Sequence, residues 1–264
     1  MKKESLIDNS SYDFERSSEA QSKEFFDRLA QLPISDESAS RVSLIESEKA
    51  KLATQWILAR KASFVLSRLR PTDALLDVGC GTGQFFRHLP TDYRGMYTGI
   101  DVSEAMIARF RERVAEETPS RLVGIDLRVL PASEISSLGT FDYVIAIGVL
   151  FYLLRDAQEA FVHDAARICR SRGFVVYDFW NRLHWRKDGN SIAPTDLSVD
   201  EAVAMAEASS LSVEDVLSSD SLDFFPAYRL RLGLEFLLQR VRVLRGVWAA
   251  RRFGHRVTVL ARKK

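Results

Sequence analysis

The sequence has few cysteines and no long apolar run. Its 264 residues include two cysteines, Cys80 and Cys169, which argues against a disulfide framework and fits a reducing compartment. No cysteine and histidine spacing typical of a zinc site occurs, so we expect no metal centre. No apolar run reaches about 18 residues, the length that suggests a membrane span. The basic start at residues 1–8 is not followed by the apolar stretch of a signal peptide. We therefore expect a cytoplasmic protein without a transmembrane segment.

An excess of charge of one sign is also missing. The chain has 37 Lys and Arg against 36 Asp and Glu, a formal net charge of +1. Bulk electrostatics therefore do not predict a nucleic-acid partner. With 46% hydrophobic residues the chain can bury a substantial core, so we expect one large domain or a domain with an appended cap.

The first 70 residues differ in pattern from those that follow. Residues 1–42 are polar with a few aromatics, and we interpret them as a lid or loose extension; residues 43–70 read as one long helix. After Pro71, short apolar runs alternate with helical stretches, a pattern typical of βα units around a mainly parallel sheet. The pattern predicts strands at residues 74–78, 97–101, 126–130, 143–147 and 174–178.

The C-terminal part adds two strands and a longer insertion. A helix at residues 199–209 is expected to lead into a strand at 211–216, and the chain closes with a strand at 255–261. Both strands are expected at an edge of the sheet. Residues 222–254 are longer than a simple connection should be and have their own aromatic and apolar side chains, so we interpret them as an inserted helical cap. Residues 43–221 and 255–264 then form the core.

A glycine-rich turn follows the first predicted strand. The strand ends in Asp77 and runs into three alternating glycines, Gly79, Gly81 and Gly83, followed by a helix-like stretch at residues 84–89. Glycines let a ligand approach the backbone closely, and the free N–H groups at the start of the next helix point into the same crevice. A mere turn seldom needs three glycines, so a cofactor site is the favoured interpretation.

The neighbouring charges select the class of cofactor. A dinucleotide fingerprint would need a glycine where Gln84 stands, and a phosphate loop would need a following Gly-Lys-Ser/Thr. Asp77 would repel a pyrophosphate, but it suits S-adenosylmethionine, which has no phosphate and carries an ammonium and a sulfonium. Asp101 ends the next strand 18 residues after Gly83, where its carboxylate can accept both hydroxyls of a ribose.

These segments resemble the class I S-adenosylmethionine-dependent methyltransferases. The run LLDVGCGTG at residues 75–83 is similar to that family's first motif, and GIDVS at 99–103 is similar to its second strand with the ribose-binding acid. FDYV at 141–144 resembles the entry to the fourth strand, and ARICRSRG at 166–173 resembles the turn before the fifth. The resemblance covers about residues 74 to 180 and is closest to small-molecule members of the type 11 and type 25 kind. It implies an α/β, Rossmann-like, seven-stranded and mainly parallel sheet flanked by helices.

The resemblance also implies which residues hold S-adenosyl-L-methionine. The family often has an acid after the third strand that meets the adenine, but Pro131 stands there, so Ser133 or Glu134 is expected to take that part. The other expected cofactor residues lie after the first, second and fourth strands: Asp77, Gly79, Cys80, Gly81, Gly83, Asp101, Val102 and Gly148.

The loops after the fourth and fifth strands should form the acceptor site. They lack the Asn/Asp-Pro-Pro-aromatic tetrad of nucleic-acid amino-methylating enzymes, the glutamates of protein-arginine methyltransferases and a catalytic cysteine pair. Nucleic acid is therefore not expected as a partner. Their aromatic residues favour a small, partly aromatic or apolar methyl acceptor: Phe151, Tyr152, Trp180 and Trp185.

In-line displacement at a sulfonium methyl needs an acceptor that is close, aligned and desolvated, and S-adenosylhomocysteine is the by-product. A hydroxyl acceptor must also lose a proton. His184 is the first candidate for that base, with a structural role weighed equally, and Tyr152 and Asp178 are alternatives. Because of this possible base, oxygen is slightly favoured over nitrogen as the acceptor atom.

Two questions stay open at the level of sequence. Residues 229–256 contain eight arginines and one acid, Glu235. This segment is either a cap helix with a solvated arginine face, which we favour, or a peripheral membrane contact or a site for an anionic or lipid-linked acceptor. The alternatives to a methyltransferase are a non-catalytic cofactor-binding regulatory or scaffold module and a nicotinamide-dependent reductase.

Overall fold

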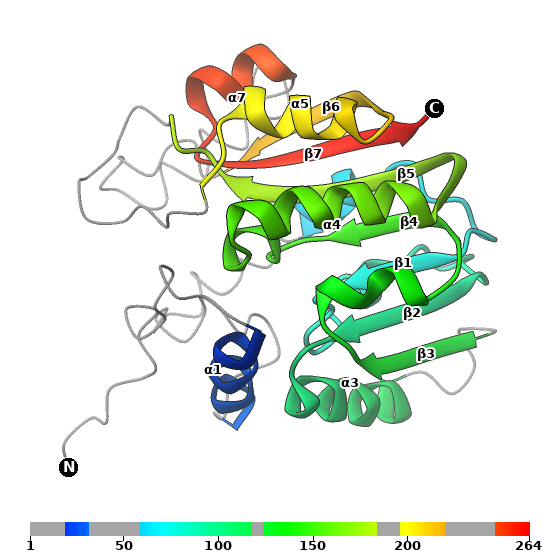
Figure 1. The fold of residues 1–264 in the computed structure, drawn as a ribbon. Coiled ribbons are helices and arrows are strands. Elements are labelled where there is room, and N and C mark those ends of the chain that lie inside the picture. The colour runs from blue at the N-terminus through cyan, green and yellow to red at the C-terminus, as the bar shows by residue number, and fades with distance from the viewer. Residues whose placement is uncertain (1–18, 32–58, 118–123, 184–195, 220–245) are drawn as a thin grey trace, which may run out of the picture.

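The structure, a computed structural model, describes residues 19–31, 59–117, 124–183, 196–219 and 246–264. Seven strands form one sheet in the order β3-β2-β1-β4-β5-β7-β6 (Figure 1). The first five pair in parallel, and β7 runs antiparallel to both of its neighbours. The predicted α/β class with a mainly parallel seven-stranded sheet is therefore confirmed. The strands are β1 (Leu75–Val78), β2 (Met96–Asp101), β3 (Gly124–Val129), β4 (Phe141–Ala146), β5 (Cys169–Trp180), β6 (Leu211–Ser219) and β7 (Arg256–Lys263).

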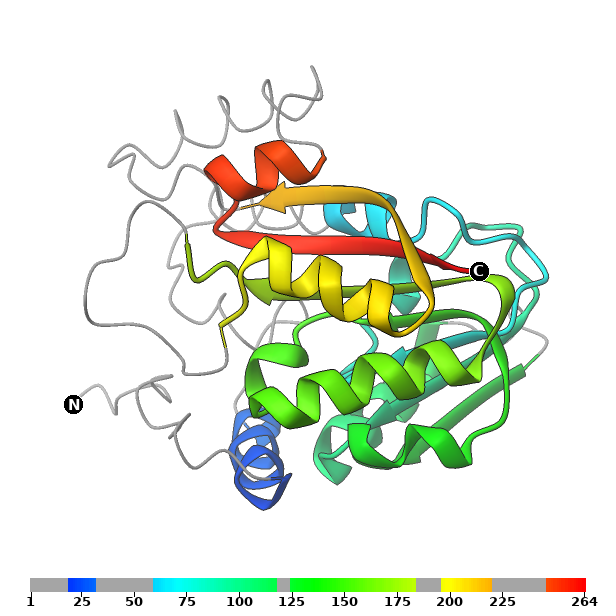
Figure 2. The ribbon, with the colours of Figure 1, turned by 45° about the horizontal axis from the view of Figure 1, so that its top comes forward.

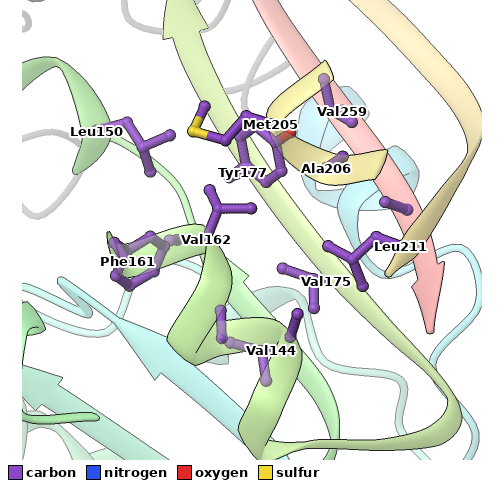
Figure 3. Close-up of a cluster of buried hydrophobic side chains, with 14 of the residues drawn as sticks. Val144, Leu150, Phe161, Val162, Val175, Tyr177, Met205, Ala206, Leu211 and Val259 are labelled. Atoms are coloured by element: carbon purple, nitrogen blue, oxygen red, sulfur yellow. The ribbon is translucent and has the colours of Figure 1, made fainter. Parts of the chain in front are cut away.

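Helices cover both faces of the sheet, because parallel strands that are apolar on both sides must bury both. On one face α4 (Arg155–Ile168) and α5 (Val199–Ala208) lie over β4, β5 and β7 (Figure 2). Figure 3 shows Val144 and Val175 of the sheet beside Val162 of α4 and Ala206 of α5. On the opposite face, the helical residues 59–65 and α3 (Glu104–Glu117) pack against β1, β2 and β4.

One predicted strand is misplaced. Residues 255–261 were expected at an edge, but β7 lies between β5 and β6, and only β6 of the two is an edge strand. Four consecutive residues of β7 are buried: Val257, Thr258, Val259 and Leu260. This burial fits a strand that pairs on both sides and has both of its faces covered. The short helix α7 (Val247–Phe253) precedes β7 and falls within the predicted cap, whose residues 222–245 lie outside the described part of the chain. The cap therefore stays a prediction.

The predicted helices differ in how well they match. The predicted helix at residues 199–209 is confirmed by α5, whose start has a capping box between Ser198 and Glu201. The predicted helix 43–70 was too long, because the helical residues 59–65 end in a turn at 66–68; residues 43–58 lie outside the described ranges. The stretch 84–89 forms only one 3-10 turn, η4 (Phe86–His88), because Gly83 has a positive φ before it and Pro90 follows it.

The helix α1 (Glu19–Gln31) lies on the side of the molecule where the carboxyl ends of the parallel strands β1 to β5 lie (Figure 1). Phe25, Leu29 and Ala30 of α1 are buried against Met106 of α3. This segment belongs to the predicted N-terminal extension of residues 1–42, and the part of the extension that the structure describes is a docked helix. In the ranges described above, no helix is both long and apolar enough to cross a membrane.

Candidate functional site

The glycine turn after β1 is bonded to the end of β2. The backbone N–H groups of Gly79 and Cys80 donate to the carbonyl of Ile100 at 2.8 and 3.0 Å. All three glycines have positive φ, at 69° for Gly79, 52° for Gly81 and 87° for Gly83. The thiol of Cys80 is buried, so this residue fixes the turn through its backbone and its packing. The turn is thereby held over the carboxyl end of β2.

Glycine is required at position 79 for two reasons. Its φ lies in the left-handed region, and a Cβ there would come within 2.5 Å of Cγ2 of Val149, in the loop after β4. A Cβ on Gly81 would instead meet no heavy atom of the described residues within 4 Å. The turn thus touches the loop after β4 at Gly79 and has space beside Gly81.

The carboxylate of Asp101 joins the turn to the start of α3. It accepts hydrogen bonds from the backbone N–H of Gly81 and of Ser103, both at 2.9 Å, and the residue is 8% exposed. Burial raises the pKa of this carboxyl to about 6, while backbone N–H groups of Ser103, Gly81 and Val102 act in the opposite direction. Asp101 therefore lies at the end of the second strand, as predicted for the ribose-binding acid, and both of its oxygens accept from backbone.

Asp77 is the second buried acid at this end of the site. It is 1% exposed, and the hydroxyl of Tyr97 donates to its Oδ2 at 2.6 Å. Burial raises the pKa of Asp77 to about 7, and the charge of Asp101 adds to the effect although the Tyr97 hydrogen bond opposes it. Within the described part of the chain neither Asp77 nor Asp101 forms an ion pair.

Helix α1 reaches the same place through Asp27, which sequence reasoning missed. The hydroxyl of Ser103 donates to Asp27 at 2.6 Å, the backbone N–H of Ala105 at 3.3 Å, and Lys23 forms an ion pair with it at 2.9 Å. Burial opposes ionisation, but the hydrogen bonds from Ser103 and Lys23 outweigh it and lower the pKa of Asp27. The only signal in the sequence is the four-residue spacing of Lys23 and Asp27, which suits one face of a helix.

At the end of β5, Asp178 has the opposite surroundings. Its carboxylate is fully buried and forms ion pairs with Lys61 and, at 2.6 Å, with Nε of Arg256. The backbone N–H of Gly148, which follows β4, donates to its other oxygen at 2.7 Å. Burial would raise the pKa of Asp178, but the two cations lower it to about 2. Such a carboxylate is a poor proton acceptor near neutral pH, which argues against Asp178 as the base.

An aromatic cluster lies beside this ion-pair site. It consists of Phe26 of α1, Phe151 and Tyr152 of η6 (Leu150–Tyr152), Trp180 at the end of β5 and His255 before β7. Successive ring centroids are 5.2 Å apart for Phe26 and Tyr152, 4.6 Å for Tyr152 and Phe151, and 5.9 Å for Phe151 and Trp180. Three of the four predicted acceptor aromatics are thus brought together, and Trp185 lies outside the described residues.

The remaining predicted residues are less informative. Val102 is half-buried between Asp101 and Ser103. Ser133 and Glu134 are exposed in η5 (Ala132–Ser137), after the carboxyl end of β3. His184 lies outside the described residues, so its role as a base stays a prediction. The cations Lys61 and Arg256 were not among the predicted site residues, because each is distant in sequence from the acid that it contacts.

Comparison with known proteins places this site in context. Residues 75–173 match the family model described as a methyltransferase domain. Phosphatidylethanolamine N-methyltransferase of Cereibacter sphaeroides is 34% identical over 137 residues, which are 50% of this chain and 59% of that protein. 2-Methyl-6-phytyl-1,4-hydroquinone methyltransferase of Synechocystis is 28% identical over 117 residues, which are 44% of this chain and 35% of that protein. The chain thus spans less than two thirds of the length of these curated relatives.

A solved structure extends the likeness to nearly the whole chain. Magnesium protoporphyrin IX methyltransferase from Synechocystis, crystallised with bound S-adenosylmethionine, has a TM-score of 0.62 to this structure. The match covers 97% of this chain and 100% of that chain at 13% sequence identity. At this identity the likeness concerns the fold, and it includes the arrangement of strands that brings the glycine turn and Asp101 together.

Proposed function

We propose that the chain is a class I S-adenosylmethionine-dependent methyltransferase and transfers the methyl group of S-adenosyl-L-methionine to a small-molecule acceptor; the match to a methyltransferase domain and the similar methyltransferases support this. S-adenosylhomocysteine is then the by-product. The observation that carries the proposal is the Asp101 carboxylate, held between the glycine turn and the start of α3 by N–H groups of Gly81 and Ser103.

The charges at this end of the site fit that cofactor. An ionised carboxylate has about four lone-pair positions. Backbone N–H groups of Gly81, Ser103 and Val102 act on Asp101, and we assign its remaining acceptor capacity to a ribose hydroxyl. Asp77 and Asp101 favour a ligand that brings positive charge, as the sulfonium and ammonium of S-adenosylmethionine do, and they oppose a pyrophosphate. In this assignment Gly79 and Gly81 lie against the methionyl part, and Val102 with Ser133 or Glu134 lies near the adenine.

The acceptor end favours a molecule with an apolar part. Phe151, Tyr152 and Trp180 present aromatic rings there, and two relatives are named for acceptors with long apolar chains. Methyl transfer requires an acceptor that is aligned and shielded from water. The contact between Phe26 of α1 and Tyr152 covers this region from the N-terminal side.

We propose oxygen as the acceptor atom, with Tyr152 or His184 as the group that removes the proton. Asp178 takes a positioning role instead, because both of its oxygens already hold partners. Nitrogen is the second candidate, because the relative from Cereibacter sphaeroides is named as an N-methyltransferase. Mass spectrometry of the methylated product would distinguish the two.

Calorimetry of the purified protein with S-adenosylhomocysteine and with NADH tests the proposal. We expect the first ligand to bind and the second not to bind. Transfer of labelled methyl from S-adenosylmethionine to a panel of hydroxyl and amine acceptors then tests catalysis. Binding of NADH alone would instead indicate a reductase, and cofactor binding without turnover on a broad panel would indicate a regulatory or scaffold module.

A further inference from the structure

Tyr97 is a buried tyrosine of β2 whose hydroxyl contacts an acid of the cofactor site. The hydroxyl donates to Oδ2 of Asp77 at 2.6 Å, and Tyr97 and Asp77 are 0% and 1% exposed. In the parallel register of β1 and β2, Gly99 stands opposite Asp77. A Cβ on Gly99 would lie 3.0 Å from Cε1 of Tyr97. Because Gly99 has no side chain, the tyrosine ring can reach across to Asp77.

Two phenylalanines hold the ring of Tyr97 in place. Its centroid is 5.2 Å from that of Phe86 in η4 and 5.9 Å from that of Phe110 in α3, and both pairs pack edge to face. Phe110 also packs against the glycine turn, because a Cβ on Gly83 would come within 2.3 Å of its ring. The direction of the Tyr97 hydroxyl is therefore fixed by the same packing that supports the turn.

The hydroxyl of Tyr97 is a donor that keeps its proton. Burial, and then the charge of Asp77, raise the pKa of Tyr97 well above its usual value. The hydrogen bond in turn lowers the pKa of Asp77, which burial raises to about 7. Tyr97 thus favours the ionised form of Asp77 without adding a charge of its own.

The groups around Asp77 differ in their effect on its charge. The charge of Asp101 raises the pKa of Asp77. The thiol of Cys80 stays neutral, because burial and the charges of these two acids raise its pKa well above the usual value. On β4 the residue paired with Asp77 is an isoleucine, and on α3 Arg113 donates to a carbonyl of the turn. Among these neighbours the Tyr97 hydroxyl has the largest effect in lowering the pKa of Asp77.

We propose that Tyr97 is a positioning residue of the cofactor site, whose hydroxyl holds the carboxylate of Asp77 in place beside the glycine turn for the positive charge of S-adenosylmethionine. This inference rests on the proposed function, since it names a further residue of the same site. A neutral donor suits this role. A lysine or arginine at the same place would also hold the carboxylate, but it would neutralise the charge with which the cation of the cofactor pairs.

Tyr97→Phe removes the hydroxyl and leaves the ring packing. S-adenosylhomocysteine, which carries the same ammonium as the cofactor, is titrated calorimetrically into the full chain at pH 6.5 and pH 8.5. We expect the variant to bind about tenfold more weakly than wild type at pH 6.5, because loss of the donor raises the pKa of Asp77 further and leaves the acid protonated. At pH 8.5 the acid is mostly ionised in both proteins, so the loss should be about twofold or less. An equal loss at both pH values, or no loss, would overturn the proposal.

Tyr177→Phe is the matched control. Tyr177 is also 0% exposed, and its hydroxyl donates to the carbonyl of Ala202 at 2.7 Å, on the other face of the sheet. This variant loses a buried hydrogen bond of the same kind, far from the glycine turn in sequence, so its affinity should equal that of wild type at both pH values. A pH-dependent loss in Tyr177→Phe would show that the effect is not specific to Tyr97 and would contradict the proposal.

The effect of Tyr97 should act through Asp77. In an Asp77→Asn background, the addition of Tyr97→Phe should cause no change in affinity that depends on pH, and such a change would count against the proposal. If Tyr97→Phe does not fold, Phe86→Leu replaces it, because this variant loosens the ring packing and leaves both hydrogen-bonding groups. It should show the same trend with a smaller factor, and equal losses at both pH values would again refute the role of Tyr97.

A measurement without the cofactor separates this inference from the proposed function. Carbon NMR of aspartate labelled at the carboxyl follows the titration of Asp77 in the ligand-free chain, with Asp77→Asn to assign the signal. Tyr97→Phe should move the midpoint to higher pH, and an unmoved midpoint would contradict the inference. If wild type does not bind S-adenosylhomocysteine, the proposed function fails even where the midpoint moves. If it binds and the affinity ratio does not depend on pH, only the role of Tyr97 is wrong.

Discussion

Two sites with buried aspartates lie at the carboxyl ends of the strands, and they differ in whether a cation pairs with the carboxylate. At the ends of β1 and β2, Asp77 and Asp101 have no ion pair among the described residues, and their pKa values rise to about 7 and about 6. At the end of β5, Asp178 has two cationic partners, and its pKa falls to about 2. Burial therefore raises the pKa of the first two carboxyls, whereas neighbouring cations lower that of the third.

The comparison shows that the role of an aspartate at a strand end depends on its partners as well as on its residue type and its place on the strand. Each of the three aspartates ends or nearly ends a strand, and each is almost fully buried. Their partners come from elsewhere in the chain: Lys61 is 117 residues from Asp178, and Arg256 is 78 residues from it. These long-range partners decide the pKa of each carboxyl.

Asp178→Asn should have the largest effect on stability. The variant removes the charge that pairs with Lys61 and Arg256, and breaking such a buried pair costs about 3–5 kcal/mol. Urea denaturation measures the free energy of unfolding. Asp200→Asn is the control, because Asp200 is 61% exposed and pairs with an exposed arginine, so it should cost less than about 1 kcal/mol. If both variants lost the same free energy of unfolding, the buried ion pairs of Asp178 would contribute no more to stability than the exposed pair of Asp200, which would contradict the comparison.

Asp101→Asn should weaken binding of S-adenosylhomocysteine by about 10- to 100-fold, because the amide loses charge and one acceptor oxygen. Isothermal calorimetry measures the dissociation constant. Asp126→Asn is the matched control, since Asp126 is a half-buried acid on β3 that pairs with Arg128. An unchanged affinity in Asp101→Asn would contradict the assignment of this carboxylate to the ribose.

The pH dependence of stability should have opposite signs at the two sites. A folded protein in which the pKa of Asp77 is about 7 holds that proton more tightly than the unfolded chain does. Its free energy of unfolding should therefore fall as pH rises from about 4 to about 7, by on the order of 1 kcal/mol or more. The contribution of Asp178 should be present above about pH 4 and be lost as pH falls toward about 2.

Urea denaturation of ligand-free wild type and Asp77→Asn at pH 5 and pH 8 isolates the first of these effects. The asparagine oxygen can still accept the hydrogen bond from Tyr97. The variant should gain stability relative to wild type at pH 8 and gain little at pH 5. A difference between the two proteins that is the same at both pH values would contradict the raised pKa of Asp77.

Asp27→Asn should have the smallest effect of these variants. It weakens the hydrogen bonds that Ser103 and Ala105 donate to α1 and the ion pair with Lys23 within α1, at a cost of about 0.5–1.5 kcal/mol. Hydrogen exchange of the α1 backbone amides should become several-fold faster. Glu24→Gln is the control, because Glu24 is 69% exposed and pairs with Arg28 on the outer side. Equal exchange rates in the two variants would show that Asp27 does not hold α1 on the site.

The sequence predicted the features that depend on local patterns. Alternating apolar runs located all seven strands to within a few residues, except that β5 begins five residues before its predicted start at residue 174. The three glycines and the acid after the second strand located the turn and the residue that meets it, because the parallel pairing of β1 and β2 brings their ends together.

What the sequence missed depends on contacts between distant segments. The place of β7 between β5 and β6 follows from strand pairing, which the alternating pattern of residues 257–260 does not encode. Lys61 reads as an ordinary helical lysine and Arg256 as one of eight arginines in a basic segment. Only the fold brings both to Asp178, and this changes a candidate base into an ion-paired anchor. Asp27 was missed for the same reason.

The most direct test of the account is whether the protein releases protons when the cofactor binds, because the account places the cofactor's positive charge beside Asp77 and Asp101. S-adenosylmethionine is titrated calorimetrically into the wild-type chain at pH 6.5 and pH 8, in buffers that differ in ionisation enthalpy. A cation that binds beside Asp77 and Asp101 must favour their ionised forms, whose pKa values are about 7 and about 6 in the free protein. We predict that binding releases protons at pH 6.5 and almost none at pH 8. Binding without proton release at pH 6.5, or with proton uptake, would contradict the account.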